Sequence, residues 1–211
     1  TVNPYSQMSS VYTISELYKI LSDPSVMPRE DQTFYKNFGA MDRAVSAREN
    51  YTFNISMYSD RIRNYESING ANLQGWHTAA GMTYLFNDEI TQYDDSFWPT
   101  VDRHRLSGTT VVKGSESASA LYGNSFAGGV GIDGQYGINA MLYTAPDDAK
   151  GTHDLNAQKA WFMFDDEVVA LGSGITSTME NDAVETIIDN RRIEKSTQKF
   201  SVNGTPLQTT L

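Results

Sequence analysis

The sequence predicts a mainly β protein, a large antiparallel β-sandwich with one short helical segment near the N-terminus. From residue 51 onward, short runs rich in β-branched and aromatic residues follow one another, and clusters of Gly, Pro, Asp and Ser separate them. The connections between these runs are too short for the crossover helices of a parallel sheet. Neighbouring strands are therefore expected to be antiparallel and to form a sandwich.

A short amphipathic helix is expected before the strands. Apolar residues recur there at helical spacing, namely Val11, Ile14, Leu17, Tyr18 and Leu21. Thr13 and Glu16 have the spacing of a capping box, which predicts that the helix begins at Thr13. Asp23-Pro24 ends the pattern, because proline cannot continue a helix.

The first strand is predicted where the period changes to two, with Tyr51, Phe53, Ile55 and Met57 on one side. Further strands are predicted at residues 82–86, 138–143, 160–164, 167–171, 184–188 and 199–202. Turns are predicted at Gly128-Gly129, Asp133-Gly134, Pro146-Asp147-Asp148 and Gly172-Ser173-Gly174. Residues 164–167 are expected to form a hairpin tip. Asn203-Gly204 is the strongest hairpin signal, with residues 206–211 as its second strand.

Composition and charge limit the classes of function. The chain has 211 residues, of which 39% are hydrophobic, so it can bury a core. It has no cysteine, which excludes disulfides and thiolate ligands. A formal net charge of −10 argues against nucleic acid or an anionic membrane as a partner. The same charge would repel an acidic polysaccharide, unless a local basic cleft dominates the field. No apolar stretch is long enough to span a membrane.

Four sequence motifs, in a fixed order, resemble a known family. Residues 61–76 are similar to the pattern Arg-Ile-x-x-Tyr-Glu-x-x-Asn-x-Glu-Asn-x-x-Gly-Trp of the polysaccharide lyases that cleave hyaluronan, chondroitin and xanthan, polysaccharide lyase family 8. Residues 81–87, 97–101 with 108–110, and 159–175 supply the other motifs. The chain departs from the pattern at Ala71, where Glu is usual, and at Ala79-Ala80, where an acidic residue usually precedes Gly-Met.

The resemblance implies a domain organisation and a reaction. Residues 1–40 would be the helical tail of an α/α-toroid domain that lies upstream. Residues 41–211 would be an incomplete central domain of the supersandwich, galactose-mutarotase-like type. The family cleaves uronic-acid polymers by β-elimination, with catalytic Asn, His, Tyr and Arg residues in the toroid. We therefore expect no catalytic residue, metal or cofactor in this chain. The expected partners are an acidic polysaccharide and the toroid, and the protein would be a secreted bacterial one.

The same resemblance places two polar residues of this chain at the substrate cleft. Glu66 and Asn69 match the Tyr-Glu-x-x-Asn motif, where Glu66 would hold a catalytic Tyr or Arg of the toroid and Asn69 would contact the substrate or that network. Trp76 is a candidate for stacking on a sugar ring. Arg61 either helps to hold the acidic sugar or pairs with a nearby acid, and Arg63 is expected to pair with an acid.

The polar residues also allow other interpretations. Arg61 and Arg63 lie two positions apart on a predicted strand, so their side chains are expected to face one side. The three histidines (His77, His104, His153) lack the spacing of a metal site and are expected at surfaces or turns. Residues 103–105 and 191–192 are expected to be solvated basic turns. A stand-alone carbohydrate-binding or structural β-module without catalysis is an alternative. So does a hydrolase that uses Glu66 with Asp60, or the carboxylates at 165–167.

Overall fold

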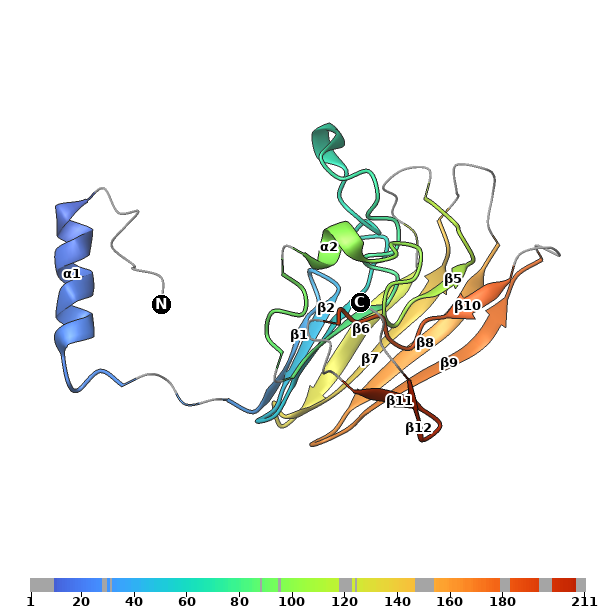
Figure 1. Ribbon diagram of the computed structural model, residues 1–211. Helices are drawn as coiled ribbons and strands as arrows, with labels where there is room; N and C mark the ends of the chain where they lie inside the picture. Colours follow the sequence, from blue (N-terminus) through green and yellow to red (C-terminus); the bar gives the residue numbers. More distant parts are fainter. Residues whose placement is uncertain are drawn as a thin grey trace. The chain divides into compact units, whose positions relative to one another are not determined.

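The computed structural model describes residues 10–27, 30, 32–87, 89–94, 96–117, 123, 125–146, 154–178, 183–193 and 199–207. The chain divides into two compact units, residues 1–32 and residues 33–211 (Figure 1). Three predictions fall at least partly outside the described residues. They are the turn at Pro146-Asp147-Asp148, the position of His153 and the end of the last strand, residues 208–211. Within the described residues, no helix has the length and apolar character that a membrane span requires.

The first unit contains the predicted helix, α1 (Val11–Ser22). Its N-cap is Ser10, whose Oγ accepts a hydrogen bond from the Thr13 backbone N–H at 3.5 Å. The capping box predicted at Thr13 is therefore wrong by one turn, because Thr13 already lies inside the helix. The helix ends at Ser22 with Asp23 as its C-cap, as the Asp23-Pro24 signal predicts, and no residue of α1 is buried within this chain.

The second unit is an antiparallel sandwich of two four-stranded sheets, as predicted (Figure 1). The first sheet is a meander in the order β1-β2-β3-β4, formed by Phe34–Phe38, Arg43–Ala47, Thr52–Ser56 and Met82–Phe86. The second has the order β6-β7-β8-β9, formed by Phe126–Ile132, Tyr136–Thr144, Asn156–Met163 and Val168–Thr176. Two short pairs complete the unit, β5 (Thr110–Val112) with β10 (Val184–Thr186) and β11 (Phe200–Val202) with β12 (Thr205–Leu207). Two short helical segments, η1 (Ile68–Gly70) and α2 (Phe97–Thr100), lie in loops.

The boundary between helical tail and sandwich lies earlier than predicted. Phe34–Phe38 forms β1 and pairs along its whole length with β2. The division between the units falls after Gln32 rather than after residue 40. The sequence of β1 does not indicate a strand, because Lys36 and Asn37 interrupt its apolar residues. Its extended conformation is determined by pairing with β2.

Hairpin turns are confirmed where two consecutive residues need a positive φ. Asp133 and Gly134 have φ of 54° and 67°, and Asn203 and Gly204 have φ of 49° and 77°. These values are typical of the two-residue turns that match the twist of the flanking strands. The predicted tip at residues 164–167 is also confirmed, because the Phe164 N–H donates to the Glu167 carbonyl at 3.0 Å.

Two glycine clusters predicted as turns are instead inside strands. Gly128-Gly129 lies within β6, and residues 172–174 lie within β9. In β6 and β7 the missing side chains make room for neighbours. A Cβ at Gly131 would lie 2.9 Å from the Tyr35 ring, and a Cβ at Gly129 would overlap the Asn139 amide. Close approach of packed groups, and not chain reversal, explains Gly129 and Gly131, whereas Gly174 has a φ of 57° at the register shift between β8 and β9.

The main core lies between the inner faces of the two sheets. Tyr35 is central to it, since its hydroxyl donates to Asn139 Oδ1 at 2.7 Å and joins β1 to β7. Trp161 is 1% exposed, as predicted for a core residue. The other large buried residues of this core are Ile55, Met57, Tyr58, Met141, Tyr143, Leu155 and Met163. A smaller core of Met82, Phe97 and Leu106 lies beneath α2 and the following loop.

Replacing Gly137 by alanine is expected to lower the free energy of unfolding by about 2 kcal/mol, because overpacking a filled site costs that much. A Cβ built on Gly137 would overlap the Tyr35 ring. Gly128→Ala in the neighbouring strand is the matched control, since its Cβ would meet Phe126 at an ordinary 3.7 Å. Urea unfolding of both variants checks the prediction, and equal stability of the two would contradict it.

Candidate functional site

All the predicted site residues lie in one long segment, residues 57–81, which connects β3 to β4. Both ends of this segment are buried, from Met57 to Ser59 and from Gly75 to His77. Its middle, residues 66–74, is largely exposed and projects from the sandwich as a tip that contains η1 (Figure 1). The segment therefore consists of a first leg (residues 57–65), an accessible tip (residues 66–74) and a second leg (residues 75–81).

The first leg is anchored by a buried carboxylate. Asp42, at the β1–β2 turn, is 0% exposed and has a φ of 52°. Its carboxylate accepts hydrogen bonds from the Ser59 hydroxyl and from Arg61 Nη2. Arg61 Nη2 also donates to the Ala127 carbonyl of β6 at 2.9 Å. One guanidinium thus ties the leg to both sheets of the sandwich.

This arrangement changes the interpretation of Arg61 and Arg63. Neither residue is in a strand, so the prediction that their side chains share one side of a strand is wrong. The acid that pairs with Arg61 is Asp42, with Asp60 more distant at 3.9 Å. Because the Arg61 side chain is still 48% exposed, contact with an acidic sugar stays a prediction.

The second leg is joined to the first just below the tip. Asn64 is buried, and its Nδ2 donates to the Trp76 carbonyl at 3.2 Å and to Ser117 Oγ at 2.9 Å. Gly75 packs so closely on Tyr65 that a Cβ there would lie 2.8 Å from the ring. These contacts fix the two ends of the tip next to each other.

Glu66 and Asn69 both lie on the exposed tip. Asn69 has a φ of 56°, in the left-handed region that Asn tolerates better than most residues, and Gly70 follows with a φ of 69°. Both Glu66 and Asn69 are exposed to solvent. The structure therefore leaves Glu66 and Asn69 available to a partner, and their roles stay predictions.

Trp76 is less accessible than predicted. It is 8% exposed, and its ring stacks on His104 with centroids 4.9 Å apart and planes at 30°. His104 in turn lies 3.1 Å from Glu116 through Nε2. Little of the indole is left for a sugar ring, so the contacts of Trp76 are those of a packing residue. His77, expected at a surface or in a turn, lies in a turn but is buried, with Nε2 2.9 Å from the Ser115 carbonyl.

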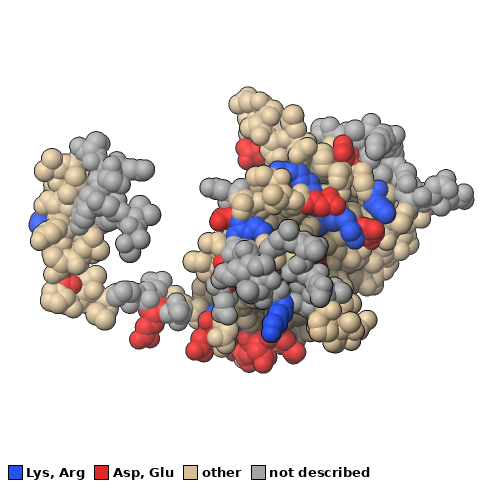
Figure 2. All heavy atoms as spheres, in the orientation of Figure 1, with Lys and Arg blue, Asp and Glu red and all other residues tan. Residues whose placement is uncertain are grey.

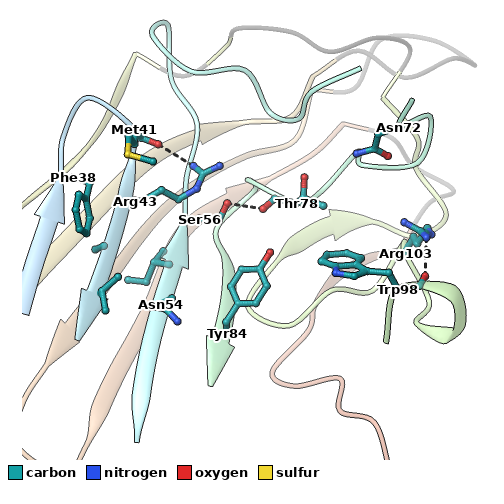
Figure 3. A pocket seen from close by; sticks show the side chains of 13 residues that line it. Phe38, Met41, Arg43, Asn54, Ser56, Asn72, Thr78, Tyr84, Trp98 and Arg103 are labelled. Carbon is teal, nitrogen blue, oxygen red and sulfur yellow. Dashed lines mark hydrogen bonds between the residues drawn. The ribbon is translucent and has the colours of Figure 1, made fainter. Parts of the chain in front are cut away.

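A hollow of about 670 Å³ lies beside the second leg, on the outer face of the first sheet (Figure 3). Strand register places Arg43 opposite Ser56, and Asn54 opposite both Val45 and Tyr84, on this outer face. Asn72 and Thr78 come from the segment at 57–81, and Trp98 and Arg103 come from α2 and the loop after it. The remaining lining residues are Phe38, Met41, Ala44 and Ile55.

The sequence patterns did not indicate this hollow. Its residues come from segments up to 65 positions apart, Phe38 to Arg103, and only the strand pairing brings them together. The basic turn predicted at residues 103–105 contributes Arg103, whose Nη2 donates to the Trp98 carbonyl at 2.7 Å. One signal was available, the alternation of Arg43 and Val45 in β2, but Ala44, Ser46 and Ala47 are weak strand formers.

Acidic side chains gather at the end of the sandwich that is lowest in Figure 2, where Figure 1 shows the β2–β3, β6–β7 and β8–β9 turns. By sequence these turns carry Glu49, Asp133 and residues 165–167. Asp165 accepts from the Tyr136 hydroxyl at 3.2 Å, as a residue of a polar turn does. The tip at 66–74 lies at the other end of the sandwich (Figure 1), so the net charge of −10 does not describe its surroundings.

Comparison with known proteins agrees with the sequence motifs. Residues 33–211 match the model of the polysaccharide lyase family 8 super-sandwich domain. The chain is 45% identical to a xanthan lyase of Bacillus sp. strain GL1, covering 96% of this chain and 21% of that protein. It is 37% identical to a hyaluronate lyase of Thermasporomyces composti, covering 96% of this chain and 26% of that protein.

Two solved structures have the same arrangement of strands. A Paenibacillus xanthan lyase superposes with a TM-score of 0.85 at 44% identity, covering 96% of this chain and 19% of that one. A Streptomyces coelicolor chondroitin AC lyase superposes with a TM-score of 0.77 at 36% identity, covering 90% of this chain and 26% of that one. The chain thus spans about a quarter or less of the length of these relatives. Through its second unit, the chain belongs to polysaccharide lyase family 8.

Proposed function

We propose that the chain forms one wall of the substrate cleft of a polysaccharide lyase. The enzyme would cleave a uronic-acid-containing polysaccharide (hyaluronan, chondroitin or xanthan) by β-elimination, with an upstream α/α-toroid domain as the opposite wall. The observation that carries this proposal is the exposed Glu66 and Asn69 motif, held between two buried anchors of a family 8 domain. A polymer substrate cannot enter a cell, so the same proposal makes the protein a secreted bacterial one.

The proposed role of the tip follows from the chemistry of β-elimination. The reaction removes the proton on C5 of a uronate and expels the oxygen linked to C4. It therefore needs a neutralised carboxylate, a base and an acid. An exposed carboxylate such as Glu66 can accept hydrogen bonds from a Tyr or Arg of the toroid and fix its orientation. Asn69 can both donate to and accept from a sugar hydroxyl or that same network.

Two apolar surfaces support the proposal that further domains contact this chain. At the tip, Ile68 and Leu73 are 59% and 66% exposed. The outer face of the second sheet exposes large apolar side chains, which include Phe126, Val130, Ile132, Leu142, Val169 and Leu171. A contiguous apolar sheet face is typical of a surface that another layer covers.

The proposed function is tested by the absorbance of the unsaturated uronate product. The chain is assayed alone and together with the upstream helical region, against hyaluronan, chondroitin sulfate and xanthan. We expect product only in the combined sample, and the active polymer identifies the substrate. Turnover by the chain alone would show that catalytic residues lie within it, and products without this absorbance would indicate a hydrolase.

In the combined sample, Glu66→Gln and Asn69→Gly are each expected to lower kcat at least tenfold, a loss of about 1.4 kcal/mol in transition-state stabilisation. Glycine is chosen at position 69 because it adopts the positive φ of 56° without strain. The control is Glu49→Gln, an exposed acid in the β2–β3 turn. If both tip variants keep kcat within twofold of the unsubstituted chain, the proposed roles are wrong.

A further inference from the structure

We propose that the hollow on the outer face of the first sheet is a binding site for a carboxylate-bearing sugar residue. This inference rests on the proposed function for the choice of a uronate, and goes beyond it by assigning a second contact, separate from Glu66 and Asn69. Figure 3 shows the labelled side chains of Arg43, Tyr84, Trp98 and Arg103 arranged around the space that the ligand would fill.

The charged groups of the hollow are all cationic. Its lining contains Arg43 and Arg103 and neither an Asp nor a Glu. Among the described residues, no carboxylate lies within 4.0 Å of either guanidinium. Both side chains are only partly exposed. In a chain with a net charge of −10, a hollow with two arginines and no acid is complementary to an anion.

Arg43 is held in place by its own backbone contacts. Its Nη1 donates to the carbonyls of Met41, Asp42 and Met57 at 3.1, 3.2 and 2.6 Å. These contacts leave Nε and Nη2 without a hydrogen bond to the described residues, in the geometry that binds a carboxylate through two parallel bonds. Burial lowers the pKa of Arg43, and the charges of Tyr84 and Asp42 oppose this shift without cancelling it.

Two further donors at the hollow have no partner among the residues that the structure describes. The Tyr84 hydroxyl and the Trp98 indole N–H make no hydrogen bond to the described residues. Burial raises the pKa of Tyr84 to about 12, so its hydroxyl remains a donor at neutral pH. Among the described residues, Arg103 donates a hydrogen bond only through Nη2, to the Trp98 carbonyl, and its guanidinium lies 5.9 Å from the Trp98 ring centroid. A ligand with several acceptor oxygens would accept hydrogen bonds from the Tyr84 hydroxyl, the Trp98 indole N–H and the Arg103 guanidinium.

The walls and the position of the hollow favour a sugar over a simple anion. Phe38, Val45 and Trp98 offer apolar surface against which the C–H face of a sugar ring can pack. A volume of about 670 Å³ lies within the range of small-molecule sites. Asn72 and Thr78 belong to the segment that carries Glu66 and Asn69. A polymer bound at the tip could therefore present a neighbouring uronate to the hollow.

The test is binding of sodium glucuronate to the 211-residue chain, followed in ¹H–¹⁵N spectra through arginine Nε–H and tryptophan indole N–H signals. We expect saturable shifts of Trp98 and Arg103, and at least a fivefold weaker affinity in Arg103→Gln and in Tyr84→Phe. Lys113→Gln, an exposed cation that does not line the hollow, should bind as the unsubstituted chain does. Arg43 also donates hydrogen bonds to three backbone carbonyls, so Arg43→Gln would change folding as well as binding. The test therefore rests on the Arg103 and Tyr84 variants.

Glucose, acetate and sulfate are titrated in parallel. Weaker binding of all three than of glucuronate supports the proposal, since glucose lacks the carboxylate and the other two lack the ring. Equal binding of acetate or sulfate would show an anion site without sugar recognition and would overturn it. So would absent binding, or binding unaffected by both variants. Any of these results leaves the product assay of the combined sample unchanged, so the two proposals can fail separately.

Discussion

Replacing Arg61 by methionine is expected to lower the free energy of unfolding by roughly 3 kcal/mol, because it leaves a buried carboxylate without its counter-charge. Asp42 is 0% exposed, and Arg61 is its cationic partner in the structure. Since the Arg61 side chain is itself 48% exposed, we expect a loss at the low end of the range for broken buried pairs. Urea unfolding followed by fluorescence measures it.

The matched control for Arg61→Met is Arg63→Met, two positions on, whose residue is exposed. Its stability should lie within about 0.5 kcal/mol of the unsubstituted chain. The double variant Arg61→Met with Asp42→Asn should recover part of the loss, because the buried charge is then gone. Asparagine also tolerates the φ of 52° at position 42. Equal losses for Arg61→Met and Arg63→Met would show that the pair contributes little.

The same variant tests whether the anchor positions the tip. Arg61 lies at the base of the segment that carries Glu66 and Asn69 and joins it to Asp42 and to the Ala127 carbonyl. Without the guanidinium, amide hydrogen exchange at residues 62–76 should accelerate more than in the strands. Uniform acceleration over the whole chain would mean that the pair stabilises the fold without holding the tip in particular.

Local sequence patterns were sufficient for elements with a strong local composition or turn signal. Residues 82–86 are rich in β-branched and aromatic residues and form β4 at those bounds, and the Asn203-Gly204 turn is where its chemistry requires it. β1 and β2 were not predicted, because Lys36, Asn37 and the small residues of β2 have weak strand preference. Their conformation depends on pairing with β3 and on the packing of Tyr35, which are non-local.

The candidate site was predictable only as far as the family motif extends. The motif led to Glu66 and Asn69, which the structure places on an exposed tip. The partner of Arg61 is 19 residues away, at Asp42, and the stacking partner of Trp76 is His104. Such pairs depend on which loops the fold brings together. A single sequence contains no local signal for them.

The stability of the chain is expected to rise as the pH increases from about 8 to about 10.5, by on the order of 3 kcal/mol from Lys159 alone. Lys159 points into the core from β8 and is 7% exposed. Its Nζ donates to the Gly108 carbonyl, and no described carboxylate lies within 4.0 Å of it. Burial lowers the pKa of Lys159 from 10.5 to about 8.

The direction of this dependence follows from proton binding. Below pH 8 the lysine is charged in the folded and unfolded states alike, so the full cost of burying the charge is present. Between the folded pKa of about 8 and the unfolded value of 10.5, the unfolded state holds the extra proton. Stability therefore rises with pH across this interval and levels off above it.

Lys159→Met isolates this contribution, because methionine fills similar space and does not titrate. Buried tyrosines also titrate at high pH, since burial raises the pKa of Tyr35 and Tyr84 to about 12, but they are common to both proteins. The difference in unfolding free energy between variant and unsubstituted chain should thus favour the variant at pH 7 and shrink or reverse by pH 10.5. The variant loses the hydrogen bond to the Gly108 carbonyl, worth about 1 kcal/mol, at every pH. A difference that stays constant from pH 7 to 10.5 would mean that Lys159 keeps an ordinary pKa in the folded state.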